Sequence, residues 1–338
     1  MKHTICFGEV LVDLLSDKLS QNNSEHEAFT KFAGGAPANV SVAIAKLGGN
    51  AYFAGMLSTD SFGDFLHNAL KEQGVKTDFM RFTDQAKTAL AFVSLDKDGD
   101  RTFEFYRDNT ADLHFTNSDF SSEWFEQCDI FHICSNTLTD ERIRKTTAYG
   151  VEFAKQNNSI VSFDINLRLN LWPSNANPRE HILPLLKHCS IIKASKEELE
   201  YLAGEQTGEE FIADTLNNGC ELFVVTDAGN PMHWYTKNAK QTLHPKKVTM
   251  VDATAAGDAF VGGLLYQLGL QNLTPSSFSK LCNTPETLTT IFEFASLCGA
   301  HAASYKGAFT SLPNEKSLND FRSALWATHL ITLKAANF

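Results

Sequence analysis

The chain has 338 residues, of which 43% are hydrophobic and 20% charged, an ordinary composition for a globular protein with a substantial buried core. The formal net charge of −11 argues against nucleic acid or an acidic membrane surface as a partner, since both bind basic faces. A phosphorylated substrate remains compatible with this charge, because a few local cations and backbone N–H groups are enough to bind one.

Cysteine and histidine spacing gives no sign of a disulfide framework or a metal centre. The seven cysteines form no CxxC pair and are odd in number, which favours buried, reduced thiols. The eleven histidines show no HxH or HExxH spacing. The amino-terminal residues alternate apolar side chains with Glu9 and Asp13, unlike a signal peptide or a membrane span. We therefore expect a cytoplasmic protein.

Short apolar runs alternate with longer amphipathic segments, as in βαβ units around a parallel sheet. Strands are predicted at Thr4–Phe7, Asp129–Cys134, Ile160–Asp164, Ser190–Ala194 and Glu221–Thr226. Helices are predicted at Pro37–Leu47, Phe62–Gln73, Asp140–Gln156, Lys196–Ala203, Glu209–Asn217, Asp258–Gln267 and Pro285–Ser304. No repeat or linker divides the chain, so residues 1–338 are expected to form one α/β domain with a mostly parallel central sheet flanked by helices.

Two segments do not follow this βαβ pattern. They alternate polar with apolar residues, as half-buried strands do. One pairs Val10–Leu15 with Ala28–Phe32. The other pairs Thr88–Leu95 with Thr102–Tyr106 across Asp98-Gly99, a dipeptide that favours a hairpin turn. Such strands in an otherwise parallel-sheet protein predict a small separate β-sheet, which would form a lid from residues 10–33 and 86–112.

Polar residues follow several predicted strands where each strand ends. Asp13 lies beyond the first strand, Asn166 and Arg168 follow Ile160–Asp164, and Thr226 ends the last strand. Ligands of open α/β sheets bind outside the carboxyl ends of the strands, so a shared site is predicted there. Arginine suits bidentate contacts to oxygen-rich ligands, with a surface salt bridge as the alternative.

The segment Asp252-Ala-Thr-Ala-Ala-Gly-Asp258 leads into an apolar helix and is the most informative feature of the chain. A helix start exposes unpaired N–H groups and partial positive charge, and small residues such as Ala256 and Gly257 let an anion approach them. A carboxylate there repels an anion unless it takes part in the chemistry; the alternative is that Asp258 only complements the helix dipole. We expect a negative φ at Ala255, because a helix begins directly after it.

Two other segments lie at predicted helix starts. Gly34-Gly35-Ala-Pro-Ala-Asn39 is either a glycine-rich turn or a loop whose Asn39 amide binds hydroxyl groups. The dinucleotide fingerprint GxGxxG is absent, which argues against a Rossmann oxidoreductase. Ser195-Lys-Glu-Glu198 is either an N-cap with acidic residues in the first turn, or a hydroxyl and carboxylate that organise water around Mg²⁺.

In this order the motifs resemble the ribokinase-like (PfkB) carbohydrate kinase family, most closely its bacterial fructokinases. The resemblance covers about residues 4–313 and rests on FGEVLVDLL, GGAPANVSVAIAKLGG, FEFYRDNTADL, FDINLRLNLW, KASKEELEYLAG and DATAAGDAF. It implies a ribokinase-like fold and transfer of the γ-phosphoryl group of MgATP to a sugar hydroxyl, with D-fructose giving fructose 6-phosphate. 2-Keto-3-deoxygluconate kinase, ribokinase and nucleoside kinase are the alternatives within the family; a catalytically weak sugar-binding regulator is the alternative outside it.

The resemblance also implies roles for matching residues. Asp258 matches the catalytic base, and the N–H groups around Ala256, Gly257 and Asp258 match the anion hole, with Ala255 where the family usually has glycine. The sugar-contacting positions are Asp13, Gly34, Gly35, Asn39, Phe103, Phe105 and Arg168. The nucleotide-side positions are Lys193, Ser195, Glu198, Thr226, Gly229 and Gly257, and Glu198 would act on Mg²⁺ through water. Asp252 lies where many relatives hold K⁺, and relatives often pair their lids, so a homodimer through the lid is expected.

Two departures from the family pattern fall on the nucleotide side. The usual Asn of the NxxE element is Ser195. The family's TxGxxG pattern is replaced by Thr226-Asp-Ala-Gly-Asn-Pro-Met232, which has a different spacing. The contacts of that loop with ATP are therefore expected to differ from those of the family.

Overall fold

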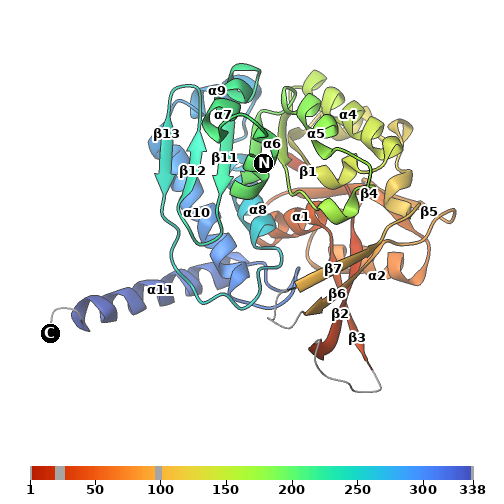
Figure 1. Cartoon of the computed structure of the whole chain (residues 1–338), viewed down its shortest axis with the longest axis horizontal. Coiled ribbons are helices and arrows are strands. Elements are labelled where there is room, and N and C mark those ends of the chain that lie inside the picture. The colour runs from red at the N-terminus through yellow and green to blue at the C-terminus, as the bar shows by residue number, and fades with distance from the viewer. Residues whose placement is uncertain (1, 20–26, 96–100, 336–338) are drawn as a thin grey trace.

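The computed structural model describes residues 2–19, 27–95 and 101–335 and contains a nine-stranded sheet in the order β13-β12-β11-β10-β9-β8-β1-β4-β5 (Figure 1). Seven strands run parallel: β1 (His3–Phe7), β4 (Ala51–Ser58), β5 (Met80–Thr83), β8 (Cys128–Cys134), β9 (Ile160–Asp164), β10 (Ile191–Ser195) and β11 (Leu222–Thr226). An antiparallel hairpin of β12 (Met232–Tyr235) and β13 (Lys240–Leu243) completes one edge. The parallel strands bring their carboxyl ends to one edge of the sheet.

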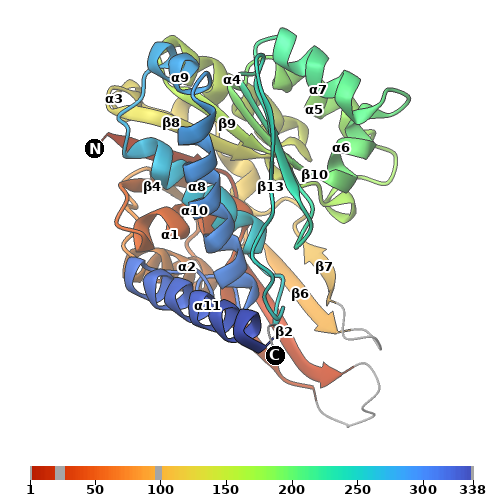
Figure 2. The ribbon, with the colours of Figure 1, turned by 90° about the vertical axis from the view of Figure 1, so that its left-hand side faces the viewer.

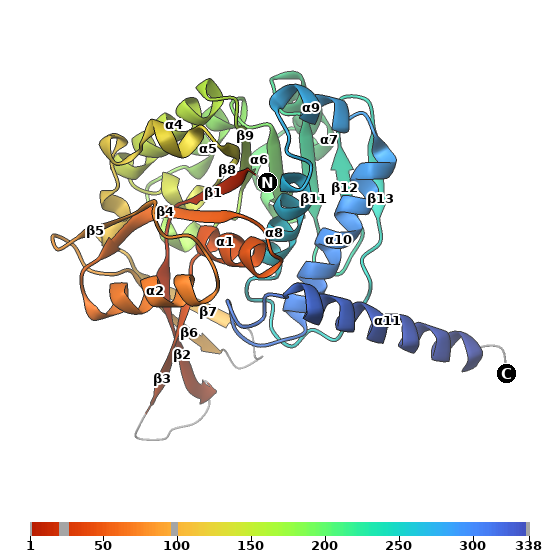
Figure 3. The same ribbon diagram turned by 180° about the vertical axis from the view of Figure 1, so that it is seen from behind.

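Helices cover both faces of this sheet, as Figures 2 and 3 show from two sides. One face carries α1 (Ala36–Lys46), α8 (Ala256–Gly269), α9 (Pro275–Leu281) and α10 (Pro285–Ala303). The other carries α3 (Ser122–Phe125), α4 (Glu141–Gln156), α5 (Pro178–Leu186), α6 (Lys196–Ala203) and α7 (Gly208–Asn217). Helix α2 (Ser61–Glu72) packs near the lid, and α11 (Glu315–Ala335) extends away from the body. Short 3₁₀ helices are η1 (Ala111–His114), η2 (Asn117–Asp119), η3 (Ser135–Leu138) and η4 (Leu169–Leu171).

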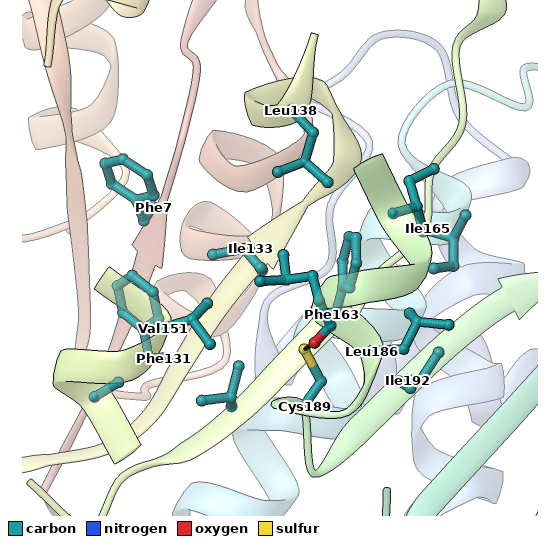
Figure 4. Close-up of a cluster of buried hydrophobic side chains, with 14 of the residues drawn as sticks. Phe7, Phe131, Ile133, Leu138, Val151, Phe163, Ile165, Leu186, Cys189 and Ile192 are labelled. Atoms are coloured by element: carbon teal, nitrogen blue, oxygen red, sulfur yellow. Dashed lines mark hydrogen bonds between the residues drawn. The ribbon is translucent and has the colours of Figure 1, made fainter. Parts of the chain in front are cut away.

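The central strands are apolar on both faces, as expected for a parallel sheet covered by helices. Phe131, Ile133, Phe163 and Ile192 point toward the α4 and α5 side (Figure 4). Alternate residues Ile130, Ile160, Ile191 and Leu222 pack on the opposite face against α8 and α10. Burial on both faces leaves the strand ends as the place where polar side chains collect.

A second sheet, in the order β3-β2-β6-β7, stands apart from the central one (Figure 2). Its strands are β2 (Leu11–Leu19), β3 (Phe29–Gly34), β6 (Leu90–Leu95) and β7 (Arg101–Tyr106). β2 and β3 pair antiparallel, as do β6 and β7, and the two hairpins join through the parallel pair β2–β6. This confirms the predicted small β-sheet, whereas the Asp98-Gly99 turn lies outside the described residues.

Several elements were not predicted from the sequence. β4 carries an apolar run with Gly55 in its middle and shows no polar alternation, and β5, β12 and β13 have only four residues each. Four residues are too few to establish a period of two. The predicted strands and helices otherwise fall at the observed elements, with ends that differ by a few residues. Over the described ranges, no helix combines the length and apolar character needed to cross a membrane.

Candidate active site

A cavity of about 800 Å³ lies at the carboxyl ends of the strands, beneath the second sheet. It brings together ten residues singled out from the sequence: Asp13, Gly35, Asn39, Phe103, Phe105, Asn166, Arg168, Asp252, Ala255 and Asp258. These residues come from both hairpins of the small sheet, from α1, from the loop after β9 and from the start of α8. The cavity therefore lies where the strand ends predicted it.

The other predicted residues lie beside this cavity or in its supporting structure. Among the described residues, Gly34, Lys193, Ser195, Glu198, Thr226, Gly229, Ala256 and Gly257 are not part of its lining. Ser195 and Thr226 pair at the ends of β10 and β11, and Gly229 follows in an exposed turn. A Cβ atom built on Gly257 would lie 3.6 Å from Lys193 Nζ, so this lysine reaches the start of α8.

Helix α1 positions Asn39 toward the cavity. Its N-cap, Gly35, has φ of 106°, and a Cβ atom there would lie 2.6 Å from the carbonyl oxygen of Glu9, so only glycine fits. One turn later, Asn39 is 5% exposed and its Nδ2 donates to Asp258 Oδ2 at 2.7 Å. Asn39 Oδ1 is buried and has no hydrogen-bond partner among the described residues, which leaves an acceptor for a bound hydroxyl group.

Asp258 lies in the first turn of α8, and its environment tunes its acidity. Burial raises its pKa to about 7, against the opposing effect of the Asn39 hydrogen bond. The charge of Asp164 raises the pKa further, whereas Arg168 and Lys193 lower it. A carboxyl group with a pKa near neutrality can accept a proton from a substrate and release it again. The geometry thus favours a chemical role over a purely dipole-complementing one.

Ala255 contradicts the expected negative φ. It is the N-cap of α8 and has φ of 58° and ψ of 8°, the left-handed conformation. A helix that begins directly after Ala255 does not impose a negative φ on it, because an N-cap residue lies outside the helix and its φ is set by the preceding loop. The turn brings the Ala255 carbonyl into line to accept a hydrogen bond from Ala259 N at 2.7 Å. Glycine would adopt this conformation without the strain that Cβ adds.

Asp252 anchors the loop that leads into α8. Its side chain is buried, Oδ1 accepts from Thr254 N at 3.0 Å, and Oδ2 accepts from Gly307 N at 2.9 Å. The backbone N–H groups of Val251 and Asp252 both bond to the Ala303 carbonyl. These contacts join the loop before α8 to the segment after α10.

Ser195 and Glu198 form a capping box at the start of α6. Glu198 Oε2 accepts from Ser195 N at 2.7 Å, and Oε1 accepts from Leu167 N at 2.7 Å. Burial raises the pKa of Glu198, against the attraction of Lys193. The carboxylate therefore ties the loop that carries Arg168 to the end of β10, and Ser195 is the N-cap of α6.

Sequence analysis did not single out several cavity residues, among them Glu9, Arg107 and Asn136. Glu9 is 1% exposed, and its Oε1 accepts from Ala36 N at 3.2 Å and from Asn136 Nδ2 at 2.9 Å. Burial raises the pKa of Glu9, and the nearby Arg107 opposes this rise. The available signal was a lone carboxylate in the apolar run FGEVL, since an unpaired charge is rarely buried.

The small sheet closes the cavity through β7. The rings of Phe103 and Phe105 stack with centroids 6.0 Å apart and line the cavity together. Asn170 Nδ2, from the loop after β9, donates to the Phe103 carbonyl at 2.9 Å. The second sheet is thereby joined to the loop that carries Arg168.

Comparison with known proteins gives a consistent result. The model of the "pfkB family carbohydrate kinase" family matches residues 1–315. The probable chloroplastic fructokinase-6 of Arabidopsis thaliana is 38% identical over 320 residues, which cover 94% of this chain and 82% of that protein. The fructokinase of Xylella fastidiosa with bound ATP has a TM-score of 0.90 at 41% identity, covering 95% of this chain and 98% of that one. A double mutant of the Vibrio cholerae O395 fructokinase, with fructose, ADP and a potassium ion bound, has a TM-score of 0.82 at 33% identity, covering 95% and 98%.

Proposed function

The chain belongs to the pfkB family of carbohydrate kinases, and we propose that it transfers the γ-phosphoryl group of ATP to the primary hydroxyl of D-fructose, giving fructose 6-phosphate. The observation that carries this proposal is Asp258: a buried carboxyl group with a pKa of about 7, hydrogen bonded to Asn39 and facing a cavity at a helix start. Fructose is proposed as the acceptor because the similar proteins are fructokinases.

The sugar would lie between Asp13, Asn39 and Arg168, beneath the aromatic wall of Phe103 and Phe105. Carboxylate, amide and guanidinium groups together supply both acceptors and donors for several hydroxyl groups. Gly34 supports the position of Asp13, because a Cβ atom on Gly34 would lie only 2.2 Å from Asp13 Oδ2. Closure of the small sheet would exclude water and limit hydrolysis of ATP.

Asp258 would take the proton of the sugar hydroxyl as its oxygen attacks the γ-phosphorus. The bond to the leaving oxygen of ADP breaks in the same displacement. No described side chain caps α8, which supports binding of the transferred group by backbone N–H groups at Ala256, Gly257 and Asp258. The helix N-terminus would stabilise the charge on the phosphoryl oxygens.

The nucleotide would bind along the ends of β10 and β11, where Lys193, Ser195, Glu198 and Thr226 lie and Gly229 follows. Within the ranges that the structure describes, no group of three or more His, Cys, Asp or Glu forms a metal site, so Mg²⁺ would be held mainly by the phosphates of ATP. Each oxygen of Glu198 accepts one backbone N–H and keeps a lone pair, which fits contact with Mg²⁺ through water.

Binding of a monovalent cation is a further part of the proposal. Asp252, a buried carboxylate in the loop beside α8, fits a potassium site, and one similar structure contains potassium. Titration with KCl against NaCl tests this directly: equal stimulation of turnover by both salts would contradict it.

Exposed aromatic side chains on the small sheet support a homodimer through the lid. Phe92 contacts Phe29 and Tyr106, with ring centroids 5.3 Å and 5.1 Å apart, and both of these partners are exposed. Sedimentation equilibrium of the wild type and of a Phe29→Ser/Tyr106→Ser variant would show a dimer and a monomer respectively. A wild-type monomer, or a variant that dimerises equally well, would remove this part of the proposal.

A coupled assay of ADP release tests the reaction itself. Fructose, ribose, glucose, 2-keto-3-deoxygluconate and nucleosides would be compared at equal ATP, with product identified by mass. We expect the highest kcat/KM with fructose. A preference for another acceptor would assign that kinase activity instead, and sugar binding without ADP release would favour a regulator.

A further inference from the structure

Helix α1 begins at an N-cap residue that has no side chain, Gly35. The first N–H groups of a helix need acceptors, which a serine, threonine, aspartate or asparagine at the N-cap usually supplies. Here Glu9, in the short connection between β1 and β2, supplies one from another part of the chain. Its Oε1 accepts from the backbone N–H of Ala36, the first residue of α1, at 3.2 Å.

Tight backbone packing holds the connection that carries Glu9 against the start of α1. A Cβ atom on Gly35 would lie 2.6 Å from the Glu9 carbonyl oxygen, and a Cβ atom on Gly8 would lie 2.6 Å from Pro37 Cγ. Glycine at these two positions therefore lets the two segments approach closely. Glu9 is 1% exposed, so its carboxyl group reaches Ala36 from inside the molecule.

The carboxyl group of Glu9 also joins this helix start to the segment after β8 and to the small sheet. Oε1 accepts from Asn136 Nδ2 at 2.9 Å, and Oε2 accepts from Cys134 Sγ at 3.8 Å. The Asn136 carbonyl accepts in turn from Arg107 Nη1 at 2.9 Å, and Arg107 directly follows β7. Glu9 therefore lies where α1, the end of β8 and the small sheet meet.

The hydrogen bonds of Glu9 can be separated from its charge. Burial raises the pKa of Glu9, whereas the charge of Arg107 and the bond from Asn136 lower it. Arg107 has a second carboxylate partner, since its Nε lies 2.6 Å from Asp112 Oδ2. A neutral acceptor at position 9 would thus leave Arg107 with a counter-charge. It would also keep both N–H bonds, because both end on the same oxygen.

The position of α1 determines whether Asn39 meets Asp258. Asn39 lies one turn after the helix start, and its backbone N–H donates to the Gly35 carbonyl at 2.8 Å. Its side-chain Nδ2 donates to Asp258 Oδ2 at 2.7 Å. A displacement of about 1 Å near a reacting group can lower a rate about 10²-fold. The start of α1 must therefore be fixed for this bond to form with good geometry.

We propose that Glu9 is a positioning residue that fixes the start of α1 so that Asn39 meets Asp258, an inference that rests on the proposed kinase reaction. Glu9 acts through the hydrogen bonds at its Oε1 and not through its charge. It touches neither the transferred phosphoryl group nor the attacking oxygen, and its effect reaches the base through α1.

The acid limb of the kcat profile distinguishes this role from a merely structural one. The side chains that act on Asp258 come from α1, from β8, from β9 and the loop after it, and from β10: Asn39, Cys134, Asp164, Arg168 and Lys193. Those that act on Glu9 are Arg107, Asp112, Cys134 and Asn136. The bond from Asn39 lowers the pKa of Asp258, so displacement of Asn39 should move the limb to higher pH. Loss of a nearby negative charge would move it to lower pH.

Glu9→Gln and Glu9→Asp separate the reach of the side chain from its charge. Glutamine has the same length and can present its oxygen to Ala36 and Asn136, with its amide group toward Cys134 Sγ, a weak acceptor. It should keep kcat within a few-fold and leave the acid limb in place. Aspartate keeps the charge but is shorter by one methylene group. It should lower kcat roughly 10- to 10²-fold, move the limb to higher pH and change KM for ATP little.

A double-mutant cycle with Asn39→Ala tests the route from Glu9 to the base. In the Asn39→Ala background, Glu9→Asp should change kcat and the acid limb little further, because the bond through which it acts is already lost. Glu221→Asp is the matched control. Its carboxyl group is half-buried at the amino end of β11 and accepts from Ser279 Oγ, away from the carboxyl ends of the strands. It should keep the wild-type profile.

Thermal melts accompany each assay, because a shortened buried side chain leaves a void. If Glu9→Asp does not fold, Ala36→Pro replaces it, since proline suits the first helical position but lacks the N–H that Glu9 accepts. Slower turnover with a limb at higher pH in either variant, beside a nearly normal Glu9→Gln, supports the proposal.

Three results would overturn it: an equal loss of turnover in Glu9→Gln, a limb that stays in place or moves to lower pH in the folded Glu9→Asp or Ala36→Pro variant, or effects of Glu9→Asp and Asn39→Ala that simply add. Failure of the proposed reaction is distinguishable, because it would already be seen in the wild type.

Discussion

Asn39 donates a hydrogen bond of 2.7 Å to Asp258, across a separation of 219 residues in the chain. One residue comes from the first turns of α1 and the other from the first turn of α8, and the two helices pack against each other. The bond orients the carboxylate, and it also opposes the rise in pKa that burial causes. The relationship links the sugar side of the cavity to the residue proposed as the base.

Asp258→Asn keeps the shape of the side chain but removes its ability to accept a proton. We expect kcat to fall by roughly 10²- to 10⁴-fold while fructose and ATP bind nearly as before. Steady-state kinetics and isothermal titration calorimetry measure both effects, with the exposed Asp78→Asn as the control. Near-normal turnover of the folded variant would reduce Asp258 to a residue that complements the helix dipole.

The pH profile should show the titration of Asp258. A base must be deprotonated to act, so kcat should fall as pH drops through about 7, the pKa of Asp258. Asn39→Ala removes a hydrogen bond that lowers this pKa, so the acid limb should move to higher pH. The kcat profile of each protein between pH 5 and pH 9 checks this. If the acid limb of the kcat profile of Asn39→Ala stayed in place or moved to lower pH, Asn39 would not lower the pKa of Asp258.

Asn39 and Arg168 are expected to contact the sugar and not the nucleotide. Both line the cavity beneath the small sheet, and Asn39 Oδ1 is an acceptor without a partner among the described residues. Asn39→Ala and Arg168→Ala should each weaken fructose binding, by about tenfold or more for the loss of one or two hydrogen bonds to a charged or buried group. Calorimetry with fructose and with ADP shows which of the two ligands these residues contact. If the variants lost affinity for ADP alone, Asn39 and Arg168 would contact the nucleotide.

Ala255→Gly should relieve strain, because Ala255 has φ of 58°. The left-handed conformation costs alanine about 1–2 kcal/mol, and the greater freedom of glycine in the unfolded chain cancels about 0.4–1 kcal/mol of that gain. The free energy of unfolding in urea should therefore rise slightly, with turnover within a few-fold of the wild type.

Ala253→Gly is the matched control for that change, since Ala253 is not among the described residues with positive φ. It should lower stability, because it adds freedom to the unfolded chain without relieving strain. If Ala255→Gly lowers stability as much as this control does, the left-handed conformation carries no strain. A large gain in turnover with Ala255→Gly would instead show that alanine impairs the loop.

Asp60 connects α2 to the small sheet and should contribute to stability in a pH-dependent way. Its Oδ1 accepts from the backbone of Phe62 and Gly63, and its two oxygens also bind the Thr88 side chain and backbone. Burial opposes its charge, but the bonds from Thr88 and Gly63 outweigh it and lower the pKa from 3.8 to about 2. Loss of this cap in Asp60→Ala should cost about 1–2 kcal/mol at pH 7.

The sign of the pH effect follows from the lowered pKa. The contribution of Asp60 is fully present above its unfolded pKa of 3.8 and is lost as pH falls through about 2. Urea unfolding at pH 7 and pH 3 should therefore show a smaller difference between wild type and Asp60→Ala at the lower pH. An equal difference at both values would mean that the ionisation of Asp60 contributes nothing.

Sequence by itself determined the architecture and several of the residues that line the cavity. The apolar runs located β1, β8, β9, β10 and β11, and the period of two located the strands of the second sheet. The carboxyl ends of those strands and the small residues before α8 predicted where the cavity lies, because these signals are local. Asp13, Asn39, Arg168 and Asp258 were found in this way, and the cavity brings them together.

Only the tertiary structure decided how charged groups at the site pair and titrate. Glu9 lies next to Arg107 and Asn136, Asp164 binds Lys193, and Asn39 meets Asp258 because separate helices and strands pack together. A pKa depends on burial and on charges that are distant in the chain, so no local pattern contains it. The left-handed Ala255 has the same origin: the loop anchored by Asp252 to Gly307 fixes the chain before the helix begins.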